Sequence, residues 1–154
     1  MIKKIPFSID TLPHPEAGFP RALELRVKSL RVLIVSGTSS VGPDRQTMHP
    51  GDCEAQARYT YKNIKDILSS KGFGIRDVVK WTIFLRDISA QYETFNKIRD
   101  EFFRENNVGR KEMAASTCVE AKLCREDLTV EIEAVAVREE GFLSRFLGAF
   151  RKNQ

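Results

Sequence analysis

The sequence lacks long apolar runs and has few of the residues that build metal and disulfide sites. No stretch reaches the roughly 18 apolar residues that cross a membrane, and the lysines near the N-terminus precede no apolar run of signal-peptide length. The 3 cysteines and 2 histidines among 154 residues fall at no metal-binding spacing. We therefore expect a cytoplasmic protein with free thiols, no metal and no cofactor.

The sequence also lacks a strong excess of either charge sign. The 25 basic and 21 acidic residues are interleaved and leave a net charge of +4. This distribution is too diffuse for a nucleic-acid footprint, so DNA is not an expected partner and RNA binding is disfavoured. The length fits one domain, which we place at residues 1–138, followed by a tail at 139–154.

What the sequence does contain is an alternation of strand and helix patterns. Short apolar runs predict strands at 23–27 and 32–35 around a turn at 28–31, and a loop of small residues follows at 36–43. Further strands are expected at 78–85, near 113–121 and near 128–138.

Two helices are expected between these strands. The first begins after Asp52, a plausible N-cap, and Gly72 and Gly74 end it. Its apolar stripe consists of Ala57, Tyr61, Ile64 and Leu68. The second begins at a cap on Ser89. Its expected inner face consists of Tyr92, Phe95, Ile98 and Phe102. The pattern as a whole favours an α+β fold with both helices on one face of the sheet.

The last strand gives the strongest signal of function. Its residues alternate between an all-apolar face and a face that carries Glu131, Glu133, Val135 and Val137. A wholly solvated face would not need the two valines, so we expect a partner subunit to cover part of it. Glu131 is then a candidate acid/base, and for Glu133 an inter-subunit salt bridge is favoured over a catalytic role.

The order and spacing of several motifs resemble the YjgF/RidA (endoribonuclease L-PSP-like) superfamily. They are the segments 35–37, 55–57, 63–64, 77–80, 84–87, 118–120 and 130–137 together with Asn96 and 102–103. The resemblance implies a chorismate-mutase-like fold and a homotrimer with a central barrel and pockets between subunits. Many relatives hydrolyse enamines or imines, and others are described as ribonucleases or translation inhibitors.

One position departs from that pattern. In the deaminase branch an arginine shortly before the cysteine holds the substrate carboxylate, and here Ser116 stands there, two residues before Cys118. The loss removes a bidentate anchor for an imino acid. Plain imine deaminase activity is thereby disfavoured.

A narrower set of segments, 36–42, 49–52 and 123–128, resembles the C-terminal half of chorismatases, which act on a vinyl ether dicarboxylate. That resemblance implies that Glu131 donates a proton, that Cys124 influences the reaction outcome and that Arg21 lies near the pocket. Gly37 and Thr38 are further pocket candidates, as are Trp81 and Phe84, for which a core role is equally open.

Neither Cys118 nor Cys124 has a histidine beside it, so both are expected to line a pocket rather than react. We expect a small anionic metabolite as the ligand, hydrolysed or rearranged with help from Glu131, and a chorismatase-like activity is favoured over a plain imine deaminase. A ligand-sensing or interaction module without turnover, and an RNA-active translation inhibitor, remain the alternatives.

The tail repeats phenylalanine every four residues at 142, 146 and 150 and carries basic residues beside them. Such an amphipathic basic helix suits a membrane surface or a partner groove. Packing onto its own or a neighbouring subunit is favoured over the membrane.

Overall fold

The computed structural model describes residues 1–12 and 18–140, and its strands form one mixed sheet of six strands. The strands are β1 (Lys3–Phe7), β2 (Ala22–Val27), β3 (Leu30–Ser39), β4 (Val78–Leu85), β5 (Ala115–Glu120) and β6 (Val130–Glu139). They lie in the order β1-β2-β3-β6-β4-β5. Neighbouring strands are antiparallel except β4 and β5, which run parallel.

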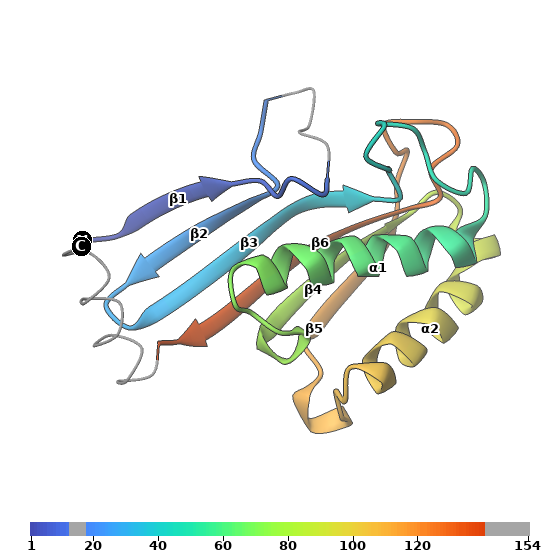
Figure 1. Cartoon of the computed structure of the whole chain (residues 1–154). Helices are drawn as coiled ribbons and strands as arrows, with labels where there is room; N and C mark the ends of the chain where they lie inside the picture. Colours follow the sequence, from blue (N-terminus) through green and yellow to red (C-terminus); the bar gives the residue numbers. More distant parts are fainter. Residues whose placement is uncertain (13–17, 141–154) are drawn as a thin grey trace.

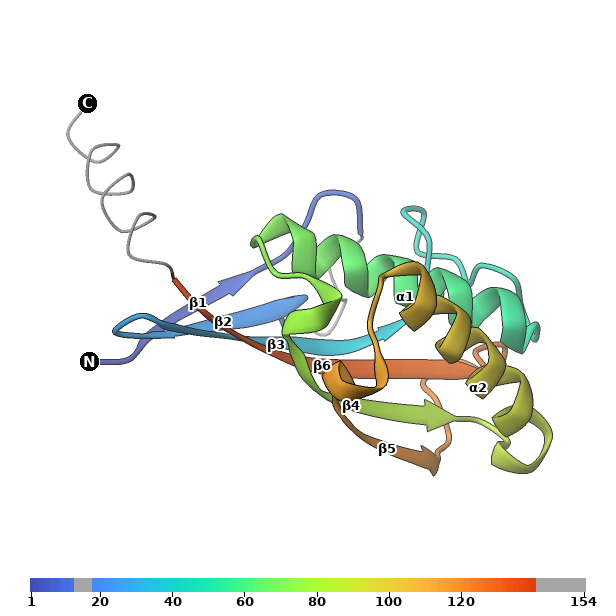
Figure 2. The same cartoon turned by 90° about the horizontal axis from the view of Figure 1, so that it is seen from below.

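Two long helices, α1 (Cys53–Ser70) and α2 (Ile88–Glu105), cover the same face of this sheet, as Figures 1 and 2 show. Short 3-10 helices, η1 (Ile75–Asp77) and η2 (Arg110–Glu112), follow them. The α+β architecture with two helices on one face is therefore confirmed. Within the described residues, no helix is both long and apolar enough to cross a bilayer. The predicted tail lies outside the described residues from position 141 onward.

Helix α1 follows the prediction closely. The Asp52 carboxylate accepts a hydrogen bond from the backbone N–H of Ala55 at 3.0 Å, which satisfies one of the free donors of the first turn. All four residues of the predicted stripe are buried beneath the helix. Gly72, just past the helix, has a φ of +73°, a conformation that favours glycine.

Helix α2 corrects two expectations. Its N-cap is Asp87, whose carboxylate accepts from the N–H of Ala90 at 2.9 Å, and not Ser89, which lies inside the first turn. Tyr92 is 46% exposed and Phe102 is half-buried, whereas Phe103 is buried together with the predicted Phe95 and Ile98.

The N-terminal half of the sheet contains one more strand than predicted. Strand β1 pairs with β2 at the edge of the sheet, where Pro6 is tolerated because edge strands have backbone groups without a partner. Strand β3 extends to Ser39 with an irregular register between Val35 and Thr38, so the predicted loop at 36–43 begins later. The predicted turn shortens to two residues, with Lys28 at a φ of +54°.

Strand β6 confirms the predicted division into two faces. Its apolar face is buried against the helices. That face consists of Val130, Ile132, Ala134 and Ala136. On the other side Glu131, Val135 and Val137 are half-buried and Glu133 is exposed. We call this side the open face, because no described helix lies over it (Figure 2).

Candidate functional site

The Glu131 carboxylate is held on the open face between two neighbouring strands. Its backbone pairs with Ser39 of β3 on one side and with Phe84 of β4 on the other. The Ser39 hydroxyl donates a hydrogen bond to Oε2 of Glu131 at 3.1 Å. One carboxylate oxygen is thus oriented by a neighbouring strand, and the half-buried side chain retains access to solvent.

Gly37 leaves room for this carboxylate. A methyl group placed at its Cα would lie 2.4 Å from Oε1 of Glu131, closer than non-bonded atoms approach. Its backbone φ is not in the left-handed region, so steric space and not conformational freedom is what glycine supplies here. The irregular register of β3 around Gly37 is typical of a bulge that re-aims nearby groups.

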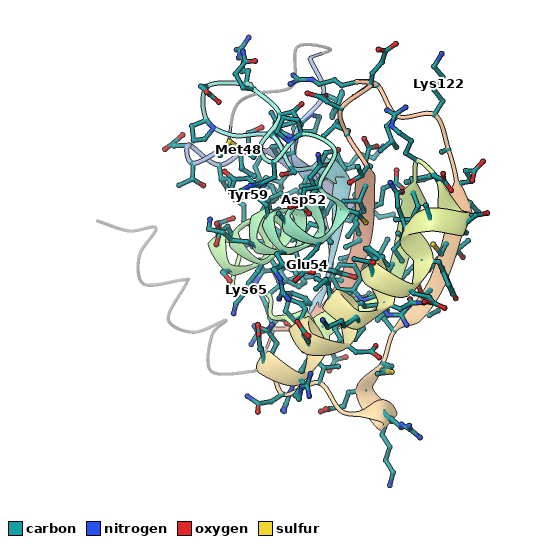
Figure 3. All side chains as sticks on the ribbon, turned by 90° about the vertical axis from the view of Figure 1, so that its right-hand side faces the viewer. Met48, Asp52, Glu54, Tyr59, Lys65 and Lys122 are labelled. Atoms are coloured by element: carbon teal, nitrogen blue, oxygen red, sulfur yellow. The ribbon has the colours of Figure 1, made fainter. Side chains whose placement is uncertain are left out.

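Two loops meet at the end of the sheet near this site. Figure 3 views that end of the molecule, with Met48 and Asp52 on the loop that leads into α1 and Lys122 on the loop that leaves β5. The hydroxyl of Thr47 donates to the Asp127 carboxylate at 2.9 Å, and the N–H of Gly51 donates to the Asp127 carbonyl at 3.0 Å. These bonds fix the loop before β6 to the loop after β3.

Arg21 and Phe84 are brought close to the Glu131 strands. The carbonyl of Arg21 accepts from the N–H of Ser36 at 3.0 Å, next to Gly37, and burial lowers the pKa of the Arg21 guanidinium without removing its charge at neutral pH. Phe84 is half-buried and opposes Glu131 on the same face. Gly37 and Phe84 thus lie beside Glu131 in one chain, and the backbone of Arg21 lies two strands away, beside Ser36.

Thr38 and Trp81 lie on the helix-covered side of the sheet, on the opposite face from Glu131. Trp81 is 2% exposed, and its ring meets the edge of Tyr61 at 5.8 Å between centroids beneath the helices. Thr38 is also buried, pairs with Ile132 on the helix-covered face and donates to the Ser36 carbonyl at 2.8 Å. The alternation of a strand turned both side chains into the core.

The remaining predicted residues are separated from Glu131 within one chain. Ser116 and Cys118 pair with inward-facing residues of β4, so they face the helix-covered side of the sheet at its β5 edge. Cys118 packs against the core, and burial raises the pKa of its thiol. Cys124 is exposed in the loop between β5 and β6.

The open face also carries a cation that sequence reasoning missed. Lys80 lines a shallow hollow of about 400 Å³ together with Phe19, Ile34, Thr82 and other residues of β3 and β6. Glu133 and Gly37 form part of the same wall, and the Cα of Gly37 lies close to the Glu131 carboxylate. Among the described residues, Thr117 is the hydrogen-bond partner of the Lys80 amine.

Across residues 1–12 and 18–140, no three His, Cys, Asp or Glu side chains lie together as a metal site would require.

Comparison with known proteins gives a consistent picture. A family model described as "Endoribonuclease L-PSP" matches residues 12–138. The 2-iminobutanoate/2-iminopropanoate deaminase of Escherichia coli K12 is 36% identical over 107 residues, which cover 70% of this chain and 80% of the relative. The 3-aminoacrylate deaminase RutC of Acinetobacter baylyi is 36% identical over 124 residues, covering 80% and 90% respectively.

Solved structures agree with these relatives. The YjgF gene product from E. coli superposes with a TM-score of 0.73 at 29% identity, covering 88% of this chain and 99% of that one. E. coli TdcF, solved with bound serine, superposes with a TM-score of 0.73 at 26% identity and the same coverage. The chain belongs to the endoribonuclease L-PSP family, also called the YjgF/RidA superfamily.

Proposed function

We propose that this protein hydrolyses a small anionic enamine or imine to the corresponding carbonyl compound and ammonia, with Glu131 transferring the proton. The observation that carries the proposal is the Glu131 carboxylate itself, oriented by the Ser39 hydroxyl and accommodated by Gly37 on the open face. The deaminase names of the two relatives described above support the reaction class.

The proposed hydrolysis requires one positioned carboxylate. An enamine first takes a proton at carbon and becomes an iminium ion. Water then adds to the iminium carbon and loses a proton to Glu131, and that proton returns to nitrogen. Ammonia leaves as the remaining hydroxyl loses its proton and becomes the carbonyl, which balances the proton first taken up at carbon. A group that exchanges protons in this way must lie within hydrogen-bond reach of the water, and the solvent-accessible side of Glu131 allows this.

We further propose that two copies of the chain build each site, as in a homotrimer. Ser116 and Cys118 face away from Glu131 in one chain, so the residues predicted to line one pocket come together only across an interface. The open face also carries an apolar area suited to a subunit contact. It comprises Leu23, Leu25, Val32, Ile34, Val135 and Val137.

The anionic group of the substrate needs a cation, because Ser116 replaces the guanidinium that the family resemblance implies. Lys80, in the hollow that Gly37 also lines, and Arg21, whose carbonyl bonds to the N–H of Ser36, are the candidate cations. Lys80 has no guanidinium fork, and Arg21 precedes β2 and does not belong to β5, where Ser116 stands, so we expect weaker selection for a carboxylate than in a deaminase that has the arginine.

The test compares wild type with Glu131→Gln on 2-aminoacrylate generated in the assay, following pyruvate and ammonia. Glu139→Gln, a carboxylate of the same strand and face, is the matched control. We expect Glu131→Gln to lose about 100-fold or more in kcat/KM, in the range of general acid–base catalysis, while Glu139→Gln stays near wild type. Equal activity of all three proteins would refute the role of Glu131.

Chorismate is the second candidate substrate, favoured by the chorismatase-like segment 36–42, which supplies both Gly37 and Ser39 at the carboxylate. Proton NMR of chorismate with wild type would show pyruvate release if this candidate holds. Binding of either substrate without turnover would instead favour a ligand-sensing role. RNA binding that falls steeply with salt would favour the RNA-active alternative.

A further inference from the structure

Helix α1 presents polar side chains to the core directly behind the proposed site. Gln56, Thr60 and Asn63 are buried, with exposed fractions of 0%, 0% and 2%. Their spacing of four and three residues puts them on one side of the helix. A helix face packed on a sheet is ordinarily apolar, because a buried polar group costs free energy unless it is hydrogen-bonded.

Asn63 is connected to the Glu131 carboxylate through one residue. Its side-chain amide donates to the carbonyl of Ser39 at 3.2 Å. The Ser39 hydroxyl in turn donates to Oε2 of Glu131 at 3.1 Å. The helix thereby fixes the backbone of the residue that orients the carboxylate.

Gln56 fixes the other strand of the site. Its amide nitrogen donates to the carbonyls of His49 and Asp127 at 2.9 and 2.8 Å. Its amide oxygen accepts from the N–H and the hydroxyl of Thr129 at 2.8 and 3.0 Å. Thr129 directly precedes β6 and lies two residues before Glu131, so Gln56 sets where that strand begins.

Thr60 lies between these two residues on the helix and serves as an internal comparison. Its buried hydroxyl has no hydrogen-bond partner among residues 1–12 and 18–140. Thr60 therefore shares the burial and polarity of its neighbours but makes no link to the site.

We infer that Asn63 and Gln56 are positioning residues, which act on catalysis through Ser39 and through the start of β6 and do not touch the substrate. This inference rests on the proposed function for its kinetic consequence alone. Its structural part, that Asn63 determines the orientation of the Glu131 carboxylate, holds whatever the substrate is.

The kinetic test uses Asn63→Ala, Ser39→Ala, the double variant and the control Thr60→Val. Asn63→Ala is expected to lower kcat about tenfold, because small displacements of a catalytic group are costly, with a smaller change in KM. In the Ser39→Ala background the same change should have little further effect on kcat, because Asn63 acts through Ser39. Thr60→Val should keep wild-type kcat and KM.

A second measurement is independent of turnover. The side-chain carboxyl carbon of Glu131 gives an NMR resonance that is assigned by its loss in Glu131→Gln. At fixed pH, Asn63→Ala and Ser39→Ala are expected to move this resonance in the same direction, and Thr60→Val is expected to leave it in place. Should Asn63→Ala not fold, Asn63→Ser replaces it, since its shorter hydroxyl cannot span the same distance.

The outcomes are distinguishable. An unmoved Glu131 resonance in the folded Asn63 variant would overturn the inference, and so would independent, additive losses of kcat in the double variant. A resonance that moves as expected, in a protein that turns over neither enamine nor chorismate, would contradict the proposed function and leave the positioning role intact.

Discussion

Gly37 and Glu131 form a close contact that one additional carbon atom would disturb. The nearest atoms to a methyl group at position 37 belong to the end of the Glu131 side chain and not to backbone. Such a group can rotate away at little cost in folding free energy, but it then leaves the position that the Ser39 hydroxyl defines.

We therefore predict that Gly37→Ala lowers kcat/KM by about 100-fold, as expected for a misplacement of about 1 Å, while the free energy of unfolding changes little. Enzyme kinetics and urea unfolding on the same preparation check both parts. Full activity in Gly37→Ala would mean that the carboxylate position seen in this structure is not the one used in catalysis.

Glu24 is a fully buried carboxylate on the helix-covered side of β2, bonded by two arginines. Arg31 and Arg26 donate to its Oε1 at 2.7 and 2.8 Å. Burial raises the pKa of Glu24, but the arginine hydrogen bonds and charges outweigh it and hold the pKa below its usual value. The carboxylate is thus ionised in the folded protein.

Removing that charge is predicted to destabilise the fold by about 3 kcal/mol at pH 7, near the low end for a buried pair because Arg26 is 41% exposed. A depressed folded-state pKa adds stability above the unfolded pKa, and this stability is lost as pH falls through the folded value. Urea unfolding should thus show a wild-type advantage over Glu24→Gln at pH 7 that shrinks below about pH 4. An advantage that is unchanged at pH 3 would contradict the ionic account.

At the level of secondary-structure elements, the start of α2 offers a direct comparison of two capping candidates. Asp87 accepts from the Ala90 N–H, whereas Ser89 lies within the helix. Asp87→Ala is predicted to cost about 1 kcal/mol, and Ser89→Ala is predicted to be neutral or slightly stabilising because alanine favours the helix interior. Thermal or urea unfolding measures the stability of the two variants. A larger loss of stability in Ser89→Ala than in Asp87→Ala would contradict the observed cap.

The elements that sequence reasoning predicted well are those with a local signal. The alternation in β6 and the stripe on α1 follow from spacing alone, and both are observed. Strand β1 was missed because its five residues contain a proline and few apolar side chains, and it exists through pairing with β2. The capping error at α2 arose because Asp87 and Ser89 are both good caps and only the chain geometry selects between them.

For the candidate site, too, local sequence patterns could not indicate contacts between residues far apart in the chain. Glu131 is a candidate from its strand pattern, but its hydrogen-bond donor Ser39 lies 92 residues away in sequence. No spacing rule connects two such positions. The polar residues Gln56 and Asn63 did leave a signal, because with Thr60 they recur at helical spacing beside the apolar residues of the buried side of α1. For Trp81 a core and a pocket role were both open, because a strand pattern alone did not indicate which face the helices cover.

At the scale of the whole molecule, the sheet has one face covered by α1 and α2 and one face that no described element covers (Figures 1 and 2). Glu131 belongs to the open face, while Ser116 and Cys118 belong to the covered side at the β5 edge. If one pocket uses both sets, adjacent copies of the chain must each supply one of them. The placement of the two sets on opposite faces therefore predicts that the protein is an oligomer.

The central claim, that two chains build one site around Glu131, is tested most directly by mixing two inactive variants. Glu131→Gln removes the acid/base, and Ser116→Glu adds a charge that repels an anionic substrate. Each should be inactive alone. After unfolding and refolding together in equal amounts, a trimer with shared sites should regain about a quarter of wild-type activity, because one interface in four then combines two intact halves. A mixture that stays as inactive as its components would contradict the shared site.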